Sequence, residues 1–201
     1  MKLYLVRHGQ TAWNAMGRYQ GTQDIPLDAE GIEQSKLLAK RLEGIIWGGA
    51  ISSDLMRAKQ TAETALGSQS DQLQIWPEFR EMNFGTWEGQ PFEKVREDYP
   101  EEVNQFLCHP GQVRIPGGET AEEVQERVVQ GIEKMKTLSS PSENWLVTSH
   151  GGTIRTLLCA LMGKSLDEMW NIHQGNTAIN ILIYTNGKWE VECLNDTSHL
   201  K

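Results

Sequence analysis

The first strand of the chain ends on a group of polar residues, and this junction constrains the possible folds more than any other stretch. Residues 1–6 are mostly apolar and predict a short strand, after which hydrophobicity stops at Arg7, His8 and Gly9. A guanidinium group presents a planar fork of donors that fits phosphate oxygens, a neutral imidazole can attack phosphorus, and glycine lets the backbone approach a ligand. The junction therefore predicts an anion site. The alternative is an ion-paired arginine beside a histidine in a turn.

A helix that follows a second predicted strand, at residues 50–52, carries a cation where the helix dipole disfavours it. Ser53 or Asp54 is expected to cap this helix, which places Arg57 in its first turn. That cost is tolerable if Arg57 points at an anion bound near the same helix end. The alternative is a surface arginine paired with Asp54 or Glu63.

Two further strand ends supply an acid and a second histidine. Glu81 follows a strand predicted at residues 73–76, beside aromatic residues that would desolvate its carboxyl group and keep it partly protonated, as a general acid requires. A nearly apolar strand at residues 144–149 ends on His150, and a helix is expected from residue 153. A strand that passes to a helix N-terminus is a backbone arrangement that binds phosphate, with a purely structural histidine as the alternative.

The remaining segments predict covering helices, a lid and a hairpin. Asp28 is expected to cap a helix over residues 29–42, and a long helix ends near residue 138. We expect core positions at Ile32, Leu37, Leu38 and Leu42 in the first helix and at Val124, Val128, Ile132 and Met135 in the second. Gly48 and Gly49 are expected to break the chain, residues 92–116 to form a lid, and Asn186-Gly187 to turn a hairpin. We assign no chemistry to Arg155.

The composition excludes several kinds of partner. The 201 residues carry a formal net charge of −8, whereas nucleic-acid binding needs a basic face. No apolar run is long enough for a transmembrane helix, and the N-terminus enters a strand without the apolar region of a signal peptide. The three cysteines show no metal-ligand spacing and are typical of reduced thiols. We therefore expect one cytoplasmic domain over residues 1–201, with no nucleic-acid or membrane partner.

Five motifs of this sequence are similar to those of one known family. They are, in order along the chain, LVRHGQTAWN, SSDLMRAKQTA, FREMNFGTWEG, PGGET and VTSHGGTIR. The chain resembles the histidine phosphatase superfamily, whose members have the phosphoglycerate-mutase-like fold. The resemblance implies a three-layer α/β/α sandwich with a mixed, largely parallel central sheet and a helical lid inserted at about residues 83–118.

The resemblance also implies a mechanism. His8 would attack phosphorus and carry the phosphoryl group, while Glu81 would protonate the leaving oxygen and then activate water. His8 must be neutral to attack, and the adjacent Arg7 disfavours its cation. The phosphoryl group would be bound by Arg7, Arg57 and His150, with contributions from Asn14, Gln20, Gly21 and Gly151. No metal or other cofactor is expected, because cationic side chains take that role.

The departures from the mutase pattern favour a phosphatase. Mutases of the superfamily need cations for a second phosphate, and they carry arginine and tyrosine where this chain has residues 82–84 (Met-Asn-Phe), and lysine where it has Phe92. The sequence therefore predicts a metal-independent phosphomonoesterase for small molecules, resembling α-ribazole phosphatases and metal-independent phosphoserine phosphatases. The alternatives are a cofactor-dependent phosphoglycerate mutase and a non-catalytic regulator that binds phospho-ligands or phosphoproteins.

The aromatic residues that follow Glu81 allow two interpretations. Phe84, Trp87, Phe92 and Phe106 either build an apolar pocket for an aromatic or nucleoside-like leaving group, or form the lid's own small core. The sequence favours neither over the other.

Overall fold

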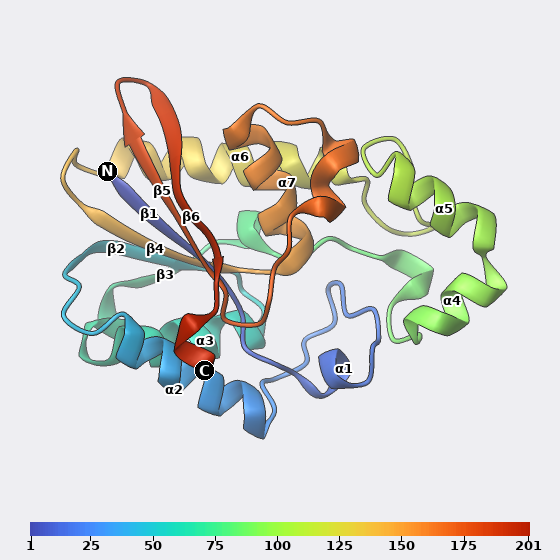
Figure 1. The fold of residues 1–201 in the computed structure, drawn as a ribbon, viewed down its shortest axis with the longest axis horizontal. Coiled ribbons are helices and arrows are strands. Elements are labelled where there is room, and N and C mark those ends of the chain that lie inside the picture. The colour runs from blue at the N-terminus through green and yellow to red at the C-terminus, as the bar shows by residue number, and fades with distance from the viewer.

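A six-stranded sheet forms the centre of the computed structural model, which describes residues 1–201 (Figure 1). In sheet order, the strands are β3 (Leu73–Ile75), β2 (Trp47–Ser52), β4 (Asn144–Ser149), β1 (Lys2–Arg7), β5 (Ile179–Thr185) and β6 (Lys188–Asp196). The first four are parallel, and β5 and β6 are antiparallel additions at one edge. The sheet is mixed and mostly parallel, as the sequence predicts.

Helices cover both faces of this sheet and give the three predicted layers (Figure 1). On one face lie α2 (Ala29–Arg41) and α3 (Met56–Leu66), which contribute Leu38, Ala65 and Leu66 to a core of ten buried residues. On the other lie α6 (Ala121–Leu138) and α7 (Gly151–Met162), which belong to a larger core of 27 buried residues. The four residues predicted for the core face of α6 are fully buried.

Two further helices extend beyond the sheet, at the far side of the molecule from the N-terminus in Figure 1. They are α4 (Phe92–Asp98) and α5 (Pro100–Cys108), and both lie within residues 83–118, called the lid segment below. Val95, Val103 and Phe106 of these helices join the same buried cluster as the residues of α6 and α7. The lid segment is therefore packed continuously onto the larger core.

Short helices complete the chain. They are α1 (Ala12–Ala15), η1 (Gly67–Gln72), η2 (Pro77–Phe79), η3 (Gly85–Trp87), η4 (Leu166–Asn171) and η5 (Ser198–Leu200). No helix is both long enough and apolar enough to cross a membrane.

The predicted buried face of α2 is wrong in two positions. Ile32 and Leu37 are 44% and 42% exposed, whereas Gly31, Gln34 and Ser35 are buried. The cause is the segment after β1, which runs directly against the helix backbone: a Cβ on Gly31 would lie 2.0 Å from the Gln10 carbonyl oxygen. Small and polar residues therefore occupy the inner face of α2.

Three local predictions also change. Gly48 and Gly49 lie inside β2 at an irregular register, and a Cβ on Gly49 would lie 2.4 Å from the Trp145 ring, so glycine here allows packing rather than breaking the strand. The N-cap of α3 is Leu55, without a side-chain cap, because Asp54 pairs instead with Arg80. The helix expected from residue 153 begins at Gly151.

The packing predicts a large difference between two leucine-to-alanine substitutions. Leu5 of β1 is fully buried between β4 and β5, so Leu5→Ala should lower the free energy of unfolding by about 2–5 kcal/mol. Leu37→Ala removes the same atoms from the exposed face of α2 and should change the free energy of unfolding by about 0.5 kcal/mol or less. Denaturant titration measures both, and equal effects would contradict this assignment of the core.

Candidate active site

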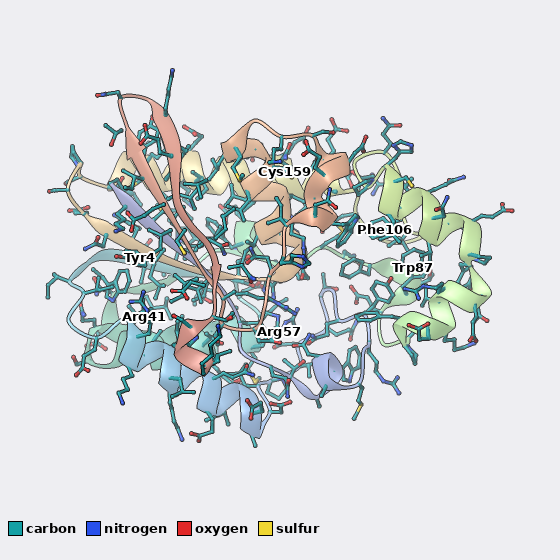
Figure 2. The ribbon with its side chains drawn as sticks, viewed as in Figure 1. Tyr4, Arg41, Arg57, Trp87, Phe106 and Cys159 are labelled. Atoms are coloured by element: carbon teal, nitrogen blue, oxygen red, sulfur yellow. The ribbon has the colours of Figure 1, made fainter.

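The carboxyl ends of the parallel strands open into a cavity of about 370 Å³ beneath the lid segment. Its lining includes these residues predicted for the site: Arg7, His8, Asn14, Gln20, Gly21, Arg57, Glu81 and Gly151. The ring of His150 lies 5.1 Å from the ring of His8, centroid to centroid. Figure 2 shows Arg57 between the sheet and the lid, with Phe106 and Trp87 on the lid side. Residues far apart in sequence thus converge as predicted.

His8 is held as a neutral imidazole with one ring nitrogen available. Its Nδ1 lies 2.6 Å from the carbonyl oxygen of Gly9, and because a carbonyl only accepts, the proton resides on Nδ1 and the lone pair on Nε2. Burial and the nearby charges of Arg57 and Arg7 keep the pKa of His8 well below its ordinary value. Nε2 is therefore nucleophilic at neutral pH.

Two buried guanidinium groups flank His8 without a carboxylate partner. Arg57 donates to the carbonyl oxygens of Gly21 and Gln23, each at 2.7 Å, and Arg7 donates to that of Gln174 at 2.6 Å. Burial lowers the pKa of each arginine to about 10, so both remain charged at neutral pH. The Nε atom of each is buried without a hydrogen-bond partner. Such cations are suited to bind an anion.

Arg155, to which the sequence assigned no role, is a third arginine in this group. Arg155 lines the cavity from α7 and donates to the Ile172 carbonyl oxygen. A Cβ on Gly151 would lie 3.0 Å from Nη1 of Arg155 and 3.4 Å from Nε of Arg7, so the two guanidinium groups meet over this glycine. The available signal was its spacing, because residue 155 lies one helical turn after residue 151.

Glu81 is held by hydrogen bonds rather than by aromatic rings. Its carboxylate accepts from the backbone N–H groups of Gly152 and Thr153, both at 3.1 Å, and from that of Met82 at 2.9 Å. A Cβ on Gly152 would lie 2.7 Å from Oε1 of Glu81, so glycine is needed for this approach. The expected desolvation by Phe84 and Trp87 is therefore not the main feature of this environment.

This contact also changes the role expected for the N-terminus of α7. Two of its first backbone donors bind Glu81 and are not free for phosphate. His150 occupies the N-cap position, with Nε2 2.8 Å from Ser53 Oγ and Nδ1 buried without a partner. Burial and Arg57 hold the pKa of His150 well below its ordinary value. Arginines and His8 therefore supply most of the polar lining of the cavity, whereas the fully buried His150 is not part of that lining.

Side-chain amides complete the floor of the cavity. Oδ1 of Asn14 accepts from the backbone N–H of Thr11 at 3.2 Å, which leaves its NH₂ group free to donate. Oε1 of Gln20 accepts from the Thr11 hydroxyl at 2.8 Å, which orients that amide in the same way. Gly21 acts through Arg57, to which its carbonyl oxygen is bonded. No group of three or more His, Cys, Asp or Glu residues is arranged to hold a metal ion.

A neutral imidazole, unpaired arginines and a positioned carboxylate at the end of a parallel sheet define a phosphoryl-transfer site. Residues 3–197 match the model of the histidine phosphatase superfamily, branch 1, and the chain belongs to this superfamily. It is therefore a member of a family of phosphatases and related enzymes.

Named relatives and solved structures support the same classification. Phosphoserine phosphatase 1 of Hydrogenobacter thermophilus is 32% identical over 100% of this chain and 94% of its own. The structure of YhfR from Bacillus stearothermophilus has a TM-score of 0.93 at 30% identity, covering 100% and 99% of the two chains. The α-ribazole phosphatase of Shigella flexneri has a TM-score of 0.86 at 29% identity, covering 98% and 96%. A Yersinia pestis relative, 32% identical over 100% of this chain and 95% of its own, bears the name phosphoglycerate mutase GpmB, qualified as probable.

The buried neutral histidines predict a loss of stability in acid. Because the folded pKa of His8 lies well below its ordinary value, the unfolded chain binds a proton below about pH 6.5 that the folded chain does not. The free energy of unfolding should then fall as the pH drops, by up to about 1.4 kcal/mol per pH unit for this residue. His8→Asn should reduce the slope, measured by denaturant titration between pH 7 and 5.

The matched control for this slope is His173→Asn, because His173 is exposed. That variant should keep the wild-type dependence on pH. An unchanged slope in His8→Asn would show that His8 is not held neutral by the fold.

Proposed function

We propose that the protein is a metal-independent phosphomonoesterase that hydrolyses small-molecule phosphate esters through a phosphohistidine on His8. The observation that carries the proposal is the tautomer of His8: with Nδ1 bonded to the Gly9 carbonyl oxygen, Nε2 faces a cavity whose floor holds unpaired Arg7 and Arg57. A nucleophile with a free lone pair, set among fixed cations, is what attack on a phosphate dianion requires.

In the first step, Nε2 of His8 forms a bond to phosphorus as the ester P–O bond breaks. The guanidinium groups of Arg7 and Arg57 bind the equatorial oxygens, where charge develops. Glu81 gives its proton to the leaving oxygen, which departs as an alcohol.

In the second step, a water molecule transfers a proton to the Glu81 carboxylate, and the oxygen of that water attacks phosphorus. The P–N bond breaks, its electron pair returns to Nε2, and inorganic phosphate leaves. Glu81 is protonated again, ready for another ester, so one residue serves as acid and then as base. His8 ends as the neutral imidazole with which it began.

The lid side of the cavity supports an apolar leaving group. Phe84, Phe92, Val103, Phe106 and Leu107 line it, and Phe84 and Phe106 also belong to the buried core. Both sequence interpretations therefore apply to Phe84 and Phe106, whereas Trp87 belongs to the core without lining the cavity and Phe92 lines the cavity without joining the core. An apolar wall opposite a cationic floor suits an ester with an aromatic or nucleoside-like group.

A second candidate function, that of a phosphoglycerate mutase, is favoured by two other residues. Arg18 and Arg96 also line the cavity, and Arg96 lies on α4 of the lid segment. Cations at the lid end suit a carboxylate or a second phosphate on the substrate, as a mutase requires. Comparing substrates therefore separates the two candidates.

The covalent step predicts that His8→Ala abolishes turnover. General base or acid effects alone are worth about 10²–10⁴-fold, so loss of the nucleophile should exceed that range in kcat with p-nitrophenyl phosphate. Wild-type protein quenched after mixing should show an acid-labile phosphohistidine by ³¹P NMR, and the variant should not. Retained hydrolysis in His8→Ala would rule out the proposed mechanism.

The apolar wall predicts a preference among esters. Aryl phosphates should have a higher kcat/KM than phosphoserine or 3-phosphoglycerate, and Phe92→Ala should lower the aryl value by about 10-fold or more, since Phe92 is 42% exposed and lines the cavity. Arg96→Ala should leave the aryl value unchanged. Higher turnover of bisphosphoglycerate-primed 3-phosphoglycerate, lost in Arg96→Ala, would establish the mutase instead.

A further inference from the structure

The segment of residues 78–82, which carries Glu81, consists of the end of η2 and an irregular stretch with little backbone pairing of its own. Between η2 and the lid segment, residues 80–82 belong to neither helix nor strand. Its carbonyl oxygens are instead bound by side chains from other elements. Ser149 Oγ donates to the Phe79 carbonyl oxygen, and Thr153 Oγ1 donates to that of Arg80, each at 2.7 Å. Side chains thus fix a segment that secondary structure does not.

Arg127, on α6, makes more of these contacts than any other side chain. Its Nη1 donates to the carbonyl oxygens of Glu78 at 2.9 Å and Arg80 at 2.7 Å, and its Nη2 donates to that of Glu81 at 3.1 Å. One guanidinium group therefore binds three of the four carbonyls between residues 78 and 81. Glu81 is held from two sides, with its backbone on Arg127 and its carboxylate on the N-terminus of α7.

The guanidinium group of Arg127 also forms a bidentate ion pair with the carboxylate of Glu119. Nε donates to Oε1 at 2.9 Å and Nη2 to Oε2 at 3.1 Å. Oε2 of Glu119 also accepts from the backbone N–H of Asn83 at 2.9 Å, and the N–H of Glu119 donates to the Asn83 carbonyl oxygen at 2.9 Å. Asn83 begins the lid segment and Glu119 follows its end. The ion pair thus joins both ends of the lid segment to the loop of Glu81.

We propose that Arg127 and Glu119 are a positioning pair for the general acid, which they keep at the distance from the leaving oxygen that proton transfer needs. The proposal rests on the proposed function, because it assigns a role toward Glu81 as acid. Neither residue lines the main cavity, so neither contacts the substrate. A lysine cannot replace Arg127, since an ammonium lacks the planar fork that reaches three carbonyls and a carboxylate together.

The test measures how the rate depends on the leaving group in a series of substituted phenyl phosphates of similar size. Arg127→Met should lower kcat/KM for phenyl phosphate by about 10²-fold, the effect of a misplacement of about 1 Å. The loss for p-nitrophenyl phosphate should be below about 10-fold, because that anion leaves without a proton. Arg127→Lys and Glu119→Gln, which keep the size or shape of the side chain, should show the same selectivity with smaller losses.

Two comparisons distinguish positioning from a general loss of structure. Arg114→Met removes an arginine that pairs with Glu123 and contacts none of residues 78–81, so it should keep the wild-type dependence on the leaving group. In a Glu81→Gln background, which already lacks the acid, Arg127→Met should add no further dependence. Melting temperatures of all variants are measured in parallel.

The outcomes separate this inference from the function on which it rests. A selective loss on poor leaving groups supports the positioning role. Equal losses across the series, or selectivity that persists in the Glu81→Gln background, would overturn it while leaving the phosphatase intact. If wild-type protein hydrolyses none of the esters and forms no phosphohistidine, the proposed function itself fails.

Discussion

The site depends on keeping one buried imidazole uncharged between two charged guanidinium groups. The chain carries a net charge of −8, yet five arginines line the cavity against a single carboxylate, that of Glu81. Arg7 and Arg57 make no ion pair and are held by backbone carbonyl oxygens instead. Carbonyl dipoles fix the position of an arginine without neutralising it, so its charge remains for a substrate. The same charge suppresses protonation of His8.

The Glu81 carboxylate is held by backbone N–H groups, whereas the arginines are held by backbone carbonyl oxygens. In the proposed mechanism Glu81 exchanges a proton at a defined place, and both of its oxygens are bonded to backbone N–H groups of α7. This arrangement uses donors that elsewhere bind phosphate at a helix N-terminus. In the same proposed mechanism the phosphoryl group is bound by arginine side chains, whose forked donors suit it equally well. The N-terminus of α7 thus binds the Glu81 carboxylate, and the arginines are left for the phosphoryl group in the proposed mechanism.

Local patterns were enough to predict the residues that stand at the ends of strands. His8, His150 and Glu81 each follow a run of apolar or β-branched residues, and parallel strands deliver their carboxyl ends to one edge of a sheet. The sheet and its covering helices follow from the same runs. Patterns failed where a tertiary contact decides: Leu37 is exposed because another segment packs against the backbone of α2. Arg127 could not be found, since an arginine on a helix surface gives no sign of which carbonyls it meets.

The loop at residues 20–23 shows how such distant contacts support the chemistry. It provides the Gly21 and Gln23 carbonyl oxygens that bind Arg57. Between them, the backbone N–H of Thr22 donates to Oε1 of Glu88 at 2.8 Å, and a Cβ on Gly21 would lie 1.8 Å from that same oxygen. Gly21 also has a φ of 54°, which glycine adopts without strain. Glycine is thus required here twice, by its backbone angle and by the carboxylate beside it. The placement of Arg57 therefore depends on Glu88, a residue outside the cavity lining, through the loop that both side chains contact. The structural support of the site thus extends beyond the residues that line the cavity.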